Sequence, residues 1–180
     1  HSKGAVNCVR YNSAGSLVVS VGTDRSIVLY EGKTFKRITR LEGVHTATIY
    51  SCAWSADDKT VMTASGDGTC KLFEVNDTSL TEVHTWNPAE FQLGKPFEKV
   101  PVGGNQVGCA FVKGDIPVCV GLNGQICVLP KKGASGDISV MTGHAAPIGA
   151  FGMDTANKVF YTGDSDGLVC KWNMESCTPM

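Results

Sequence analysis

The chain has 180 residues, of which 42% are hydrophobic and 18% charged, and its formal net charge is −1. Such a chain can bury a substantial core, and the composition excludes an intrinsically disordered protein. It contains no dense run of Lys and Arg, and no apolar run approaches the ~18 residues of a membrane span, so we predict that neither nucleic acid nor a membrane is its partner.

The first part of the chain has the pattern of four short β-strands. Hydrophobic and polar residues alternate, and the runs are separated by turns rich in Gly, Asn and Asp. The predicted strands span residues 6–11, 17–21, 26–30 and 35–40. The last of them carries Lys36, Arg37 and Arg40, charges that suit an outer edge strand that must not pair with other chains.

The same pattern follows over residues 49–54, 60–64, 70–75 and 81–86. A long connection, Asn87 to Gly104, then carries three prolines together with Phe91 and Phe97. Two interpretations of this connection stay open. Long loops on a rigid scaffold often carry binding residues, and the two phenylalanines could equally pack back over the neighbouring sheet.

Two further copies complete the chain. The third has predicted strands over 106–112, 116–120, 125–129 and 138–141, and the fourth over 148–153, 159–162 and 168–173. The last residues, 175–180, are short for a fourth strand and contain Pro179, which cannot donate to a sheet ladder. We therefore expect the last copy to be incomplete.

A set of four residue types recurs along these copies. A histidine, a hydroxyl residue, an aspartate and an aromatic residue follow one another at steps of 18, 4 and 6, the first step being 19 in the earliest copy. The sets are His144, Thr162, Asp166 and Trp172; His45, Thr63, Asp67 and Phe73; and His1, Ser20, Asp24 and Tyr30. The third copy lacks the histidine and has Asn123 where the others have aspartate.

This repeat resembles the WD repeat, in which each repeat supplies one four-stranded blade of a β-propeller. The resemblance implies an all-β propeller with blades of about 1–43, 44–100, 101–142 and 143–180. It also implies that the recurring His, hydroxyl, Asp and aromatic residues form a buried hydrogen-bonded relay within each blade. A network of this kind stabilises a blade only when its members are satisfied, so the blade around Asn123 should be the softest.

Six of the eight cysteines follow the same period. Cys8, Cys52 and Cys109 recur in the first strand, and Cys70, Cys127 and Cys170 in the third. No Cys-x-x-Cys pair exists to begin a zinc site, so we predict no metal site and interpret these residues as small apolar packing between sheets. Free buried thiols indicate a reducing compartment.

Several strings extend the resemblance to one family. Val6-Asn7-Cys8-Val9-Arg10-Tyr11, the run Ser26 to Tyr30, and a third blade without its histidine are similar to the later blades of the first propeller of the actin-interacting protein 1 family. Members of that family disassemble actin filaments together with cofilin in the cytoplasm. The resemblance thus implies actin and cofilin as partners, a cytoskeletal location, and no catalysis or cofactor.

Two positive side chains are the binding candidates. Lys3 follows the first relay histidine, and Arg25 lies in the turn beside Asp24, so both should emerge on one rim of the propeller. Gly4-Ala5 stand where the family commonly has an aromatic residue that contributes to binding. The resemblance therefore does not imply a binding contact at that place.

Two other function classes remain as alternatives. A generic WD-repeat scaffold would dock peptides on its rim. An enzyme would need a site such as His144 with Asp166 and Thr162, but these positions match the buried relay, and the phosphate-binding signature G-x-x-x-x-G-K-[ST] is absent.

Four blades cannot comfortably close a ring that has seven or eight in this family. We therefore expect a piece of a longer protein, with an exposed blade face at each end. Those faces should either remain at the ends of an incomplete arc or pack against a second copy of the chain.

Overall fold

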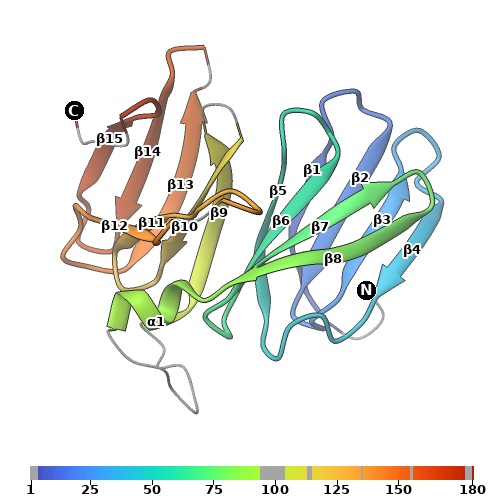
Figure 1. The fold of residues 1–180 in the computed structure, drawn as a ribbon, viewed down its shortest axis with the longest axis horizontal. Helices are drawn as coiled ribbons and strands as arrows, with labels where there is room; N and C mark the ends of the chain where they lie inside the picture. Colours follow the sequence, from blue (N-terminus) through green and yellow to red (C-terminus); the bar gives the residue numbers. More distant parts are fainter. Residues whose placement is uncertain (1–3, 94–103, 113–114, 135, 155, 177–179) are drawn as a thin grey trace.

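A computed structural model describes the chain except residues 1–3, 94–103, 113–114, 135, 155 and 177–179. Four antiparallel sheets, here called blades 1 to 4, stand side by side in an arc (Figure 1). In each blade the strands follow one another in chain order from one edge of the sheet to the other. This is the arrangement of successive β-propeller blades, and it confirms the predicted all-β fold class.

The strands are short, as the predicted turns required. Blade 1 contains β1 (Val6–Tyr11), β2 (Leu17–Gly22), β3 (Ile27–Glu31) and β4 (Arg37–Leu41). Blade 2 contains β5 (Ile49–Trp54), β6 (Thr60–Ser65), β7 (Cys70–Asn76) and β8 (Ser79–Trp86). Blade 3 contains β9 (Gln106–Val112), β10 (Ile116–Gly121), β11 (Gln125–Val128) and β12 (Ser139–Thr142). Blade 4 contains β13 (Ile148–Asp154), β14 (Val159–Asp164) and β15 (Val169–Asn173).

Blade 4 has three strands among the described residues, in agreement with the expected incomplete last copy. The backbone N–H of Met180 donates to the carbonyl of Lys171 at 2.9 Å, so the chain returns to the outer edge of β15. The predicted long connection also contains a short helix, α1 (Pro88–Leu93), which periodicity did not indicate. Phe97, and the side chain of Phe91, lie outside the described part of the structure.

The core lies between the blades. Successive side chains of a strand point to opposite faces of its sheet, so a sheet that has a blade on either side carries apolar side chains on both faces. Val19, Leu29 and Phe73 belong to the layer between blades 1 and 2, and Met62 and Cys119 to the layer between blades 2 and 3. Trp172, Phe160 and Ile126 fill the layer between blades 3 and 4. The blades are therefore held together by continuous apolar packing rather than by a single central core.

Six of the seven described cysteines are buried, and all seven are free thiols. They lie in these layers, where β1, β5 and β9 supply one series and β7, β11 and β15 another. Burial raises the pKa of the Cys109 thiol to about 12, so this group stays protonated and unreactive at neutral pH.

A backbone constraint recurs in the turn between the second and third strands. Gly68, Gly124 and Gly167 have φ of 84°, 85° and 87° in blades 2, 3 and 4. Arg25 occupies the equivalent place in blade 1 with φ of 61°. Glycine adopts this left-handed conformation without strain, whereas a residue with a Cβ does not.

Neighbouring blades are also joined by carboxylates in the turns between first and second strands. Asp58 accepts hydrogen bonds from the backbone N–H of Ser13 at 2.8 Å and of Ala14 at 3.2 Å, and from the Ser13 hydroxyl at 2.6 Å. Asp115 accepts from the backbone N–H of Ala56 at 2.7 Å. In both cases the carboxylate belongs to the later blade and reaches back to the turn of the earlier one.

No helix among the described residues is long and apolar enough to cross a membrane.

Candidate functional site

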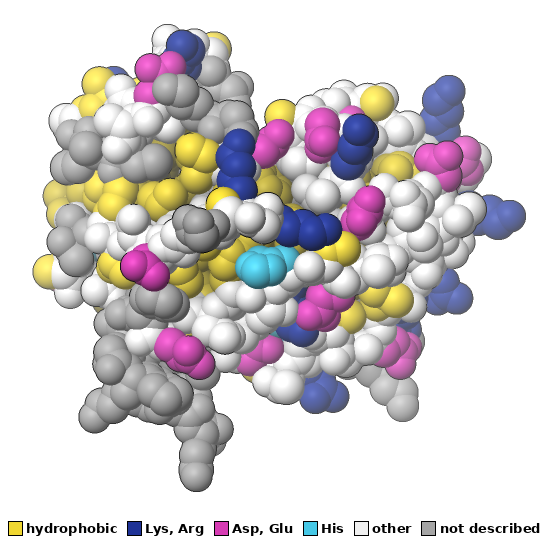
Figure 2. Space-filling view, in the orientation of Figure 1, with side chains coloured by type: hydrophobic (Ala, Val, Ile, Leu, Met, Phe, Trp, Pro, Cys, Tyr) yellow, Lys and Arg dark blue, Asp and Glu magenta, His cyan; other side chains and the backbone are white. Residues whose placement is uncertain are grey.

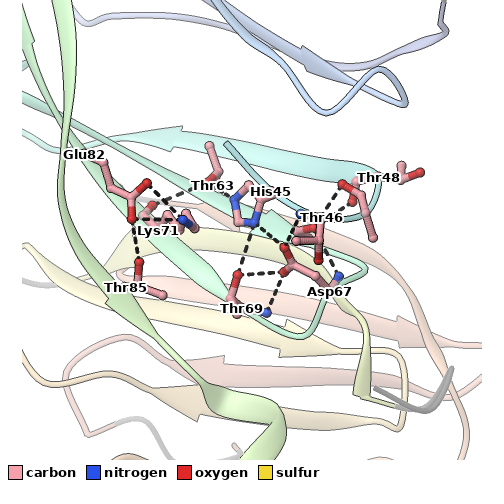
Figure 3. Close-up of polar contacts among 11 residues, drawn as sticks. His45, Thr46, Thr48, Thr63, Asp67, Thr69, Lys71, Glu82 and Thr85 are labelled. Atoms are coloured by element: carbon pink, nitrogen blue, oxygen red, sulfur yellow. Dashed lines mark hydrogen bonds and ion pairs between the residues drawn. The ribbon is translucent and has the colours of Figure 1, made fainter. Parts of the chain in front are cut away.

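The relay of blade 2 joins two loops and one strand that are separated in the sequence (Figure 3). His45 lies in the connection between β4 and β5, Thr63 in β6, and Asp67 in the turn before β7. His45 Nδ1 is 2.9 Å from Asp67 Oδ2, and His45 Nε2 is 2.8 Å from Thr63 Oγ1. Phe73, the predicted aromatic member, is fully buried in the layer between blades 1 and 2.

The direction of these hydrogen bonds follows from what each group can do. A carboxylate only accepts, so His45 Nδ1 carries the proton and donates to Asp67. The other ring nitrogen then accepts from the Thr63 hydroxyl. Asp67 is further held by Thr69, whose hydroxyl and backbone N–H donate at 2.6 and 3.0 Å, and by the backbone N–H of Thr46 at 3.0 Å.

Blade 4 contains a longer relay. The indole N–H of Trp172 donates to Thr162 Oγ1 at 2.7 Å, and Thr162 Oγ1 is 2.6 Å from His144 Nε2. His144 Nδ1 is 2.8 Å from Asp164 Oδ2. Trp172 is fully buried, and the side chain of His144 has no exposed surface. The four groups therefore form one buried line of hydrogen bonds.

The carboxylate of this relay is Asp164, not Asp166 as the spacing predicted. The side chain of Asp164 is 2% exposed, whereas Asp166 is exposed and contributes its backbone N–H to Asp164 Oδ1 at 3.1 Å. Asp164 Oδ1 also accepts from the backbone N–H of Leu168 at 2.9 Å. An aspartate two residues earlier can cap the turn and reach the histidine at once, which leaves Asp166 on the surface.

In blade 1 two residues of the same blade hold the predicted relay aspartate. Asp24 Oδ1 accepts from the hydroxyl of Ser26 at 2.8 Å, and Asp24 Oδ2 pairs with Arg40 Nη2 at 3.0 Å. Arg40 is thus turned inward from β4, in contrast to the edge charge predicted from the sequence. Ser20 is buried and Tyr30 half-buried, and His1 lies outside the described residues.

Blade 3 lacks the histidine and the carboxylate. The side-chain amide of Asn123 makes two hydrogen bonds to Gln125. Its Nδ2 donates to Gln125 Oε1 at 2.8 Å, and its Oδ1 accepts from the backbone N–H of Gln125 at 3.2 Å. Gln106, at the start of β9, is fully buried, and its Nε2 donates to the carbonyl of Gly104 at 2.8 Å. Asn123 therefore stabilises its own turn. It does not link this turn to a distant loop through a histidine ring, as the relay aspartates of blades 2 and 4 do.

The relay carboxylates make folding sensitive to acid. Burial alone would raise the pKa of Asp67, but the hydrogen bonds from His45 and Thr69 outweigh it and hold that pKa well below the usual range. The hydrogen bond from His144 likewise lowers the pKa of Asp164. A group with a depressed folded pKa contributes stability above its unfolded pKa, about 4 for Asp, and that stability is lost as pH falls through and below this value.

We therefore predict that the free energy of unfolding, measured with urea at a series of pH values, falls steeply below about pH 4. Asp67→Asn should be less stable than the parent at neutral pH and should show a shallower fall, because one depressed carboxyl has been removed. The same pH slope in both proteins would contradict the assignment of Asp67 to a buried relay.

The relay has the geometry of a structural support and not of a reactive site. Thr63 and Thr162 are buried, and their hydroxyls are already engaged with the histidines. Within the described ranges no group of three or more His, Cys, Asp and Glu side chains is placed to hold a metal ion. What the relay does chemically is to fix the loops that carry it, and these loops form one rim of the arc.

Of the two rim candidates, Arg25 is exposed in the turn between β2 and β3. Lys3 lies outside the described residues. The described rim also carries the uncharged residues Thr46, Ala47 and Gly66 on blade 2, and the exposed carboxylates Glu42 before blade 2 and Asp166 on blade 4. The sequence analysis did not predict the left-handed conformation of Arg25. The alignment of Arg25 with three turn glycines of the other blades could have revealed it.

Comparison with known families and proteins agrees with the blade pattern. Residues 1–31 and 35–74 match the family described as "WD domain, G-beta repeat". The chain is 34% identical to WD repeat-containing protein 1 of Xenopus tropicalis over 95% of its length, and 32% identical to Actin-interacting protein 1 of Drosophila melanogaster over 96%. It is also 32% identical to the 66 kDa stress protein of Physarum polycephalum over 95%.

The chain spans about a quarter of the length of these relatives, 27% and 26% for the first two. Among solved structures, it superposes on the "Structure of U3-55K" with a TM-score of 0.78 and 14% identity, covering all of this chain and 52% of that one. The "Crystal structure of RRP9 WD40 repeats" gives the same TM-score over 51% of its chain. At this identity the superposition speaks for the fold alone.

Proposed function

The chain belongs to the WD-repeat proteins, and on that basis we propose that it is part of a longer protein of the actin-interacting protein 1 type. Such a protein would bind actin filaments decorated with cofilin and promote their disassembly without catalysis. The observation that carries the proposal is the 32% identity over 96% of the chain to a relative named Actin-interacting protein 1. We place the protein in the cytoplasm at the cytoskeleton, with no nucleic acid partner.

The architecture supports a binding role. Buried relays hold the rim loops of blades 2 and 4 in place, so a partner would meet a preformed surface and little ordering entropy would be lost on binding. Fixed loops on a rigid scaffold are where binding residues commonly lie.

The experiment that tests the proposal is co-sedimentation of the chain with actin filaments, with and without cofilin. Pelleting that increases when the filaments carry cofilin is the expected result. A chain that stays in the supernatant under both conditions, while remaining folded by circular dichroism, would favour the alternative of a general WD-repeat scaffold for other protein complexes.

Arg25 is the residue we assign to this contact. It keeps a charged side chain in a left-handed turn where the three other blades have glycine, and such conformations cost free energy and cluster at functional positions. We predict that Arg25→Gly leaves stability unchanged or raises it by up to about 1 kcal/mol, while it weakens pelleting with decorated filaments.

The matched control is Lys59→Ala, because Lys59 is exposed in the turn between β5 and β6, at the opposite end of the strands. That variant should pellet like the parent. If Arg25→Gly binds decorated filaments as tightly as the parent, the strained arginine has no part in the contact.

We also infer that the two end faces of the arc need a partner. Val9 is 47% exposed on blade 1, and Tyr161 and Val169 are 38% and 67% exposed on blade 4. Large exposed apolar residues in one region mark interaction surfaces. In the longer protein further blades would cover them, and the isolated chain should self-associate through them.

Sedimentation-velocity centrifugation of the chain at rising concentration should therefore show dimers or larger species. Val169→Glu should shift the chain towards monomer, because it places a charge on one of the end faces. A parent chain that stays monomeric throughout would remove this part of the proposal.

A further inference from the structure

A basic and aromatic corner lies on blade 1, at the end of the strands away from the relay loops (Figure 1). It consists of the turn between β3 and β4, with Lys33, Phe35, Lys36 and Arg37, together with Tyr11 at the end of β1. All five side chains are exposed. Figure 2 shows several Lys and Arg side chains along the edge of the molecule where Figure 1 places blade 1, with Asp and Glu side chains between them.

Phe35 is held in this corner at a conformational cost. Its side chain is 60% exposed and its φ is 56°, a left-handed value that is unusual for a bulky residue. The ring packs edge-on against Tyr11, with the centroids 6.3 Å apart, and the Tyr11 hydroxyl donates to the carbonyl of Gly32 at 3.4 Å. A strained aromatic residue that buries little of its own surface contributes little to the fold, and its conformation points to a role in binding.

Beside the corner, the surface is hollowed between blades 1 and 2. The hollow has a volume of about 550 Å³ and lies between the turn of β3 and β4 and the turn of β7 and β8. Leu17 and Ile38 give it an apolar part, and Lys36 and Arg37 give it a positive wall. Asp77 and Glu31 also line it, and Glu31 accepts a hydrogen bond from the Thr34 hydroxyl.

We propose that this corner binds a short acidic peptide segment of a partner protein. The carboxylates of the peptide would face Lys33, Lys36 and Arg37, and an apolar side chain would enter the hollow against Leu17 and Ile38. Phe35 would cover that side chain. The pairing rests on charge complementarity, because the corner has three positive charges against the one carboxylate beside it, Glu31, in a chain whose net charge is −1.

A short peptide fits this surface better than an extended polyanion does. Asp57 is exposed on the turn between β5 and β6, and Asp77 on the turn between β7 and β8 lines the blade 2 side of the hollow, so a segment avoids both carboxylates only if it is short enough to keep its own carboxylates on the blade 1 side. A nucleic acid or an anionic membrane that reached across both blades would meet these carboxylates and be repelled. The site differs from the relay rim, so it does not depend on the proposed actin function.

Fluorescence anisotropy of the full 180-residue chain with a labelled, glutamate-rich peptide that carries one central leucine tests the proposal. Binding in the micromolar range that weakens as salt is added is expected. The double variant Lys36→Glu, Arg37→Glu should lose affinity by about tenfold or more, whereas Lys59→Glu, a charge reversal on the adjacent blade, should bind the peptide like the parent.

Phe35→Gly tests whether Phe35 contributes to peptide binding and not to the stability of the fold. Glycine suits the left-handed turn, so the melting temperature should not fall, yet the affinity for the peptide should drop severalfold. Unchanged affinity in Phe35→Gly or in the double variant would overturn the proposal. So would equal or tighter binding of single-stranded DNA or phosphatidylserine vesicles, or equal binding of the same peptide with lysine in place of glutamate.

Discussion

Trp172→Ala is expected to be among the most destabilising single changes in this chain, with a loss of about 3–5 kcal/mol. The indole is fully buried and stacks on Phe160, with ring centroids 5.8 Å apart and planes inclined by 7°. It also donates to Thr162 Oγ1 at 2.7 Å. A Cβ at Gly143 would overlap the indole ring, so the surroundings are shaped closely around it. Removal therefore leaves a large cavity and an unsatisfied relay.

The size of this loss can be measured by urea unfolding followed by circular dichroism. Trp172→Phe is the matched control, because phenylalanine keeps most of the apolar contact and removes only the N–H donor. Blade 2 tolerates Phe73 at the corresponding place in its own relay. Trp172→Phe should therefore cost clearly less than Trp172→Ala, and equal costs would mean that packing plays no part at this position.

Asp164→Ala is expected to lower the melting temperature by several degrees, because it leaves His144 Nδ1 without its buried acceptor. It also removes the acceptor of the Asp166 and Leu168 backbone N–H groups, which opens the turn. Asp166→Ala should change the melting temperature little, since its side chain is exposed and surface substitutions usually have small effects.

The comparison decides between two aspartates only two residues apart. Thermal unfolding of both variants in one buffer is sufficient, with Asn123→Ala as a third protein whose turn carries no histidine. Asn123→Ala should cost less than Asp164→Ala, because the amide it removes bonds only to Gln125. A larger loss for Asp166→Ala than for Asp164→Ala would mean that the relay of blade 4 runs through the later carboxylate.

Fold class was predictable from the chain because alternation and turn residues act locally. The starts of β1, β5, β9 and β13 agree with the predicted ones, since each begins where a polar connection gives way to an alternating run. Family resemblance then supplied the propeller arrangement, which no local pattern contains. The helix α1 was missed because its six residues are too few to show a period.

The relay residues were harder to assign. In blade 4 the segment Thr162 to Gly167 offers two aspartates, and the repeat spacing selects the one before glycine. The structure uses Asp164, because that residue lies at the end of β14 and faces the histidine from there. Spacing could not decide this, because the choice depends on which carboxylate the folded turn buries. The corresponding residue in blade 2 is Ser65, which bonds to the carbonyl of Thr48 at 3.0 Å.

Charge assignments depend on tertiary contacts in the same way. Arg40 resembles its neighbours Lys36 and Arg37 in sequence, yet it pairs with Asp24 while they remain exposed. Its strand position gives the reason, because Arg40 stands opposite Val28, one strand from the turn that holds Asp24. A pattern of alternating residues indicates a face of the strand, but it does not say which face has a buried carboxylate nearby.

The carboxylates that reach from one blade to the previous one give the stack a direction. Asp58 fastens the first turn of blade 1, and Asp115 fastens that of blade 2, so each junction closes only when the later blade has been made. On a ribosome, blades 2 and 3 would thus each lock the preceding blade as they emerge. In blade 4 the left-handed residue of that turn is Lys158, which cannot accept a hydrogen bond and pairs instead with Glu175. Among the described residues, the turn of blade 4 therefore offers no carboxylate at that position to fasten blade 3, and we expect separation of the arc to begin there.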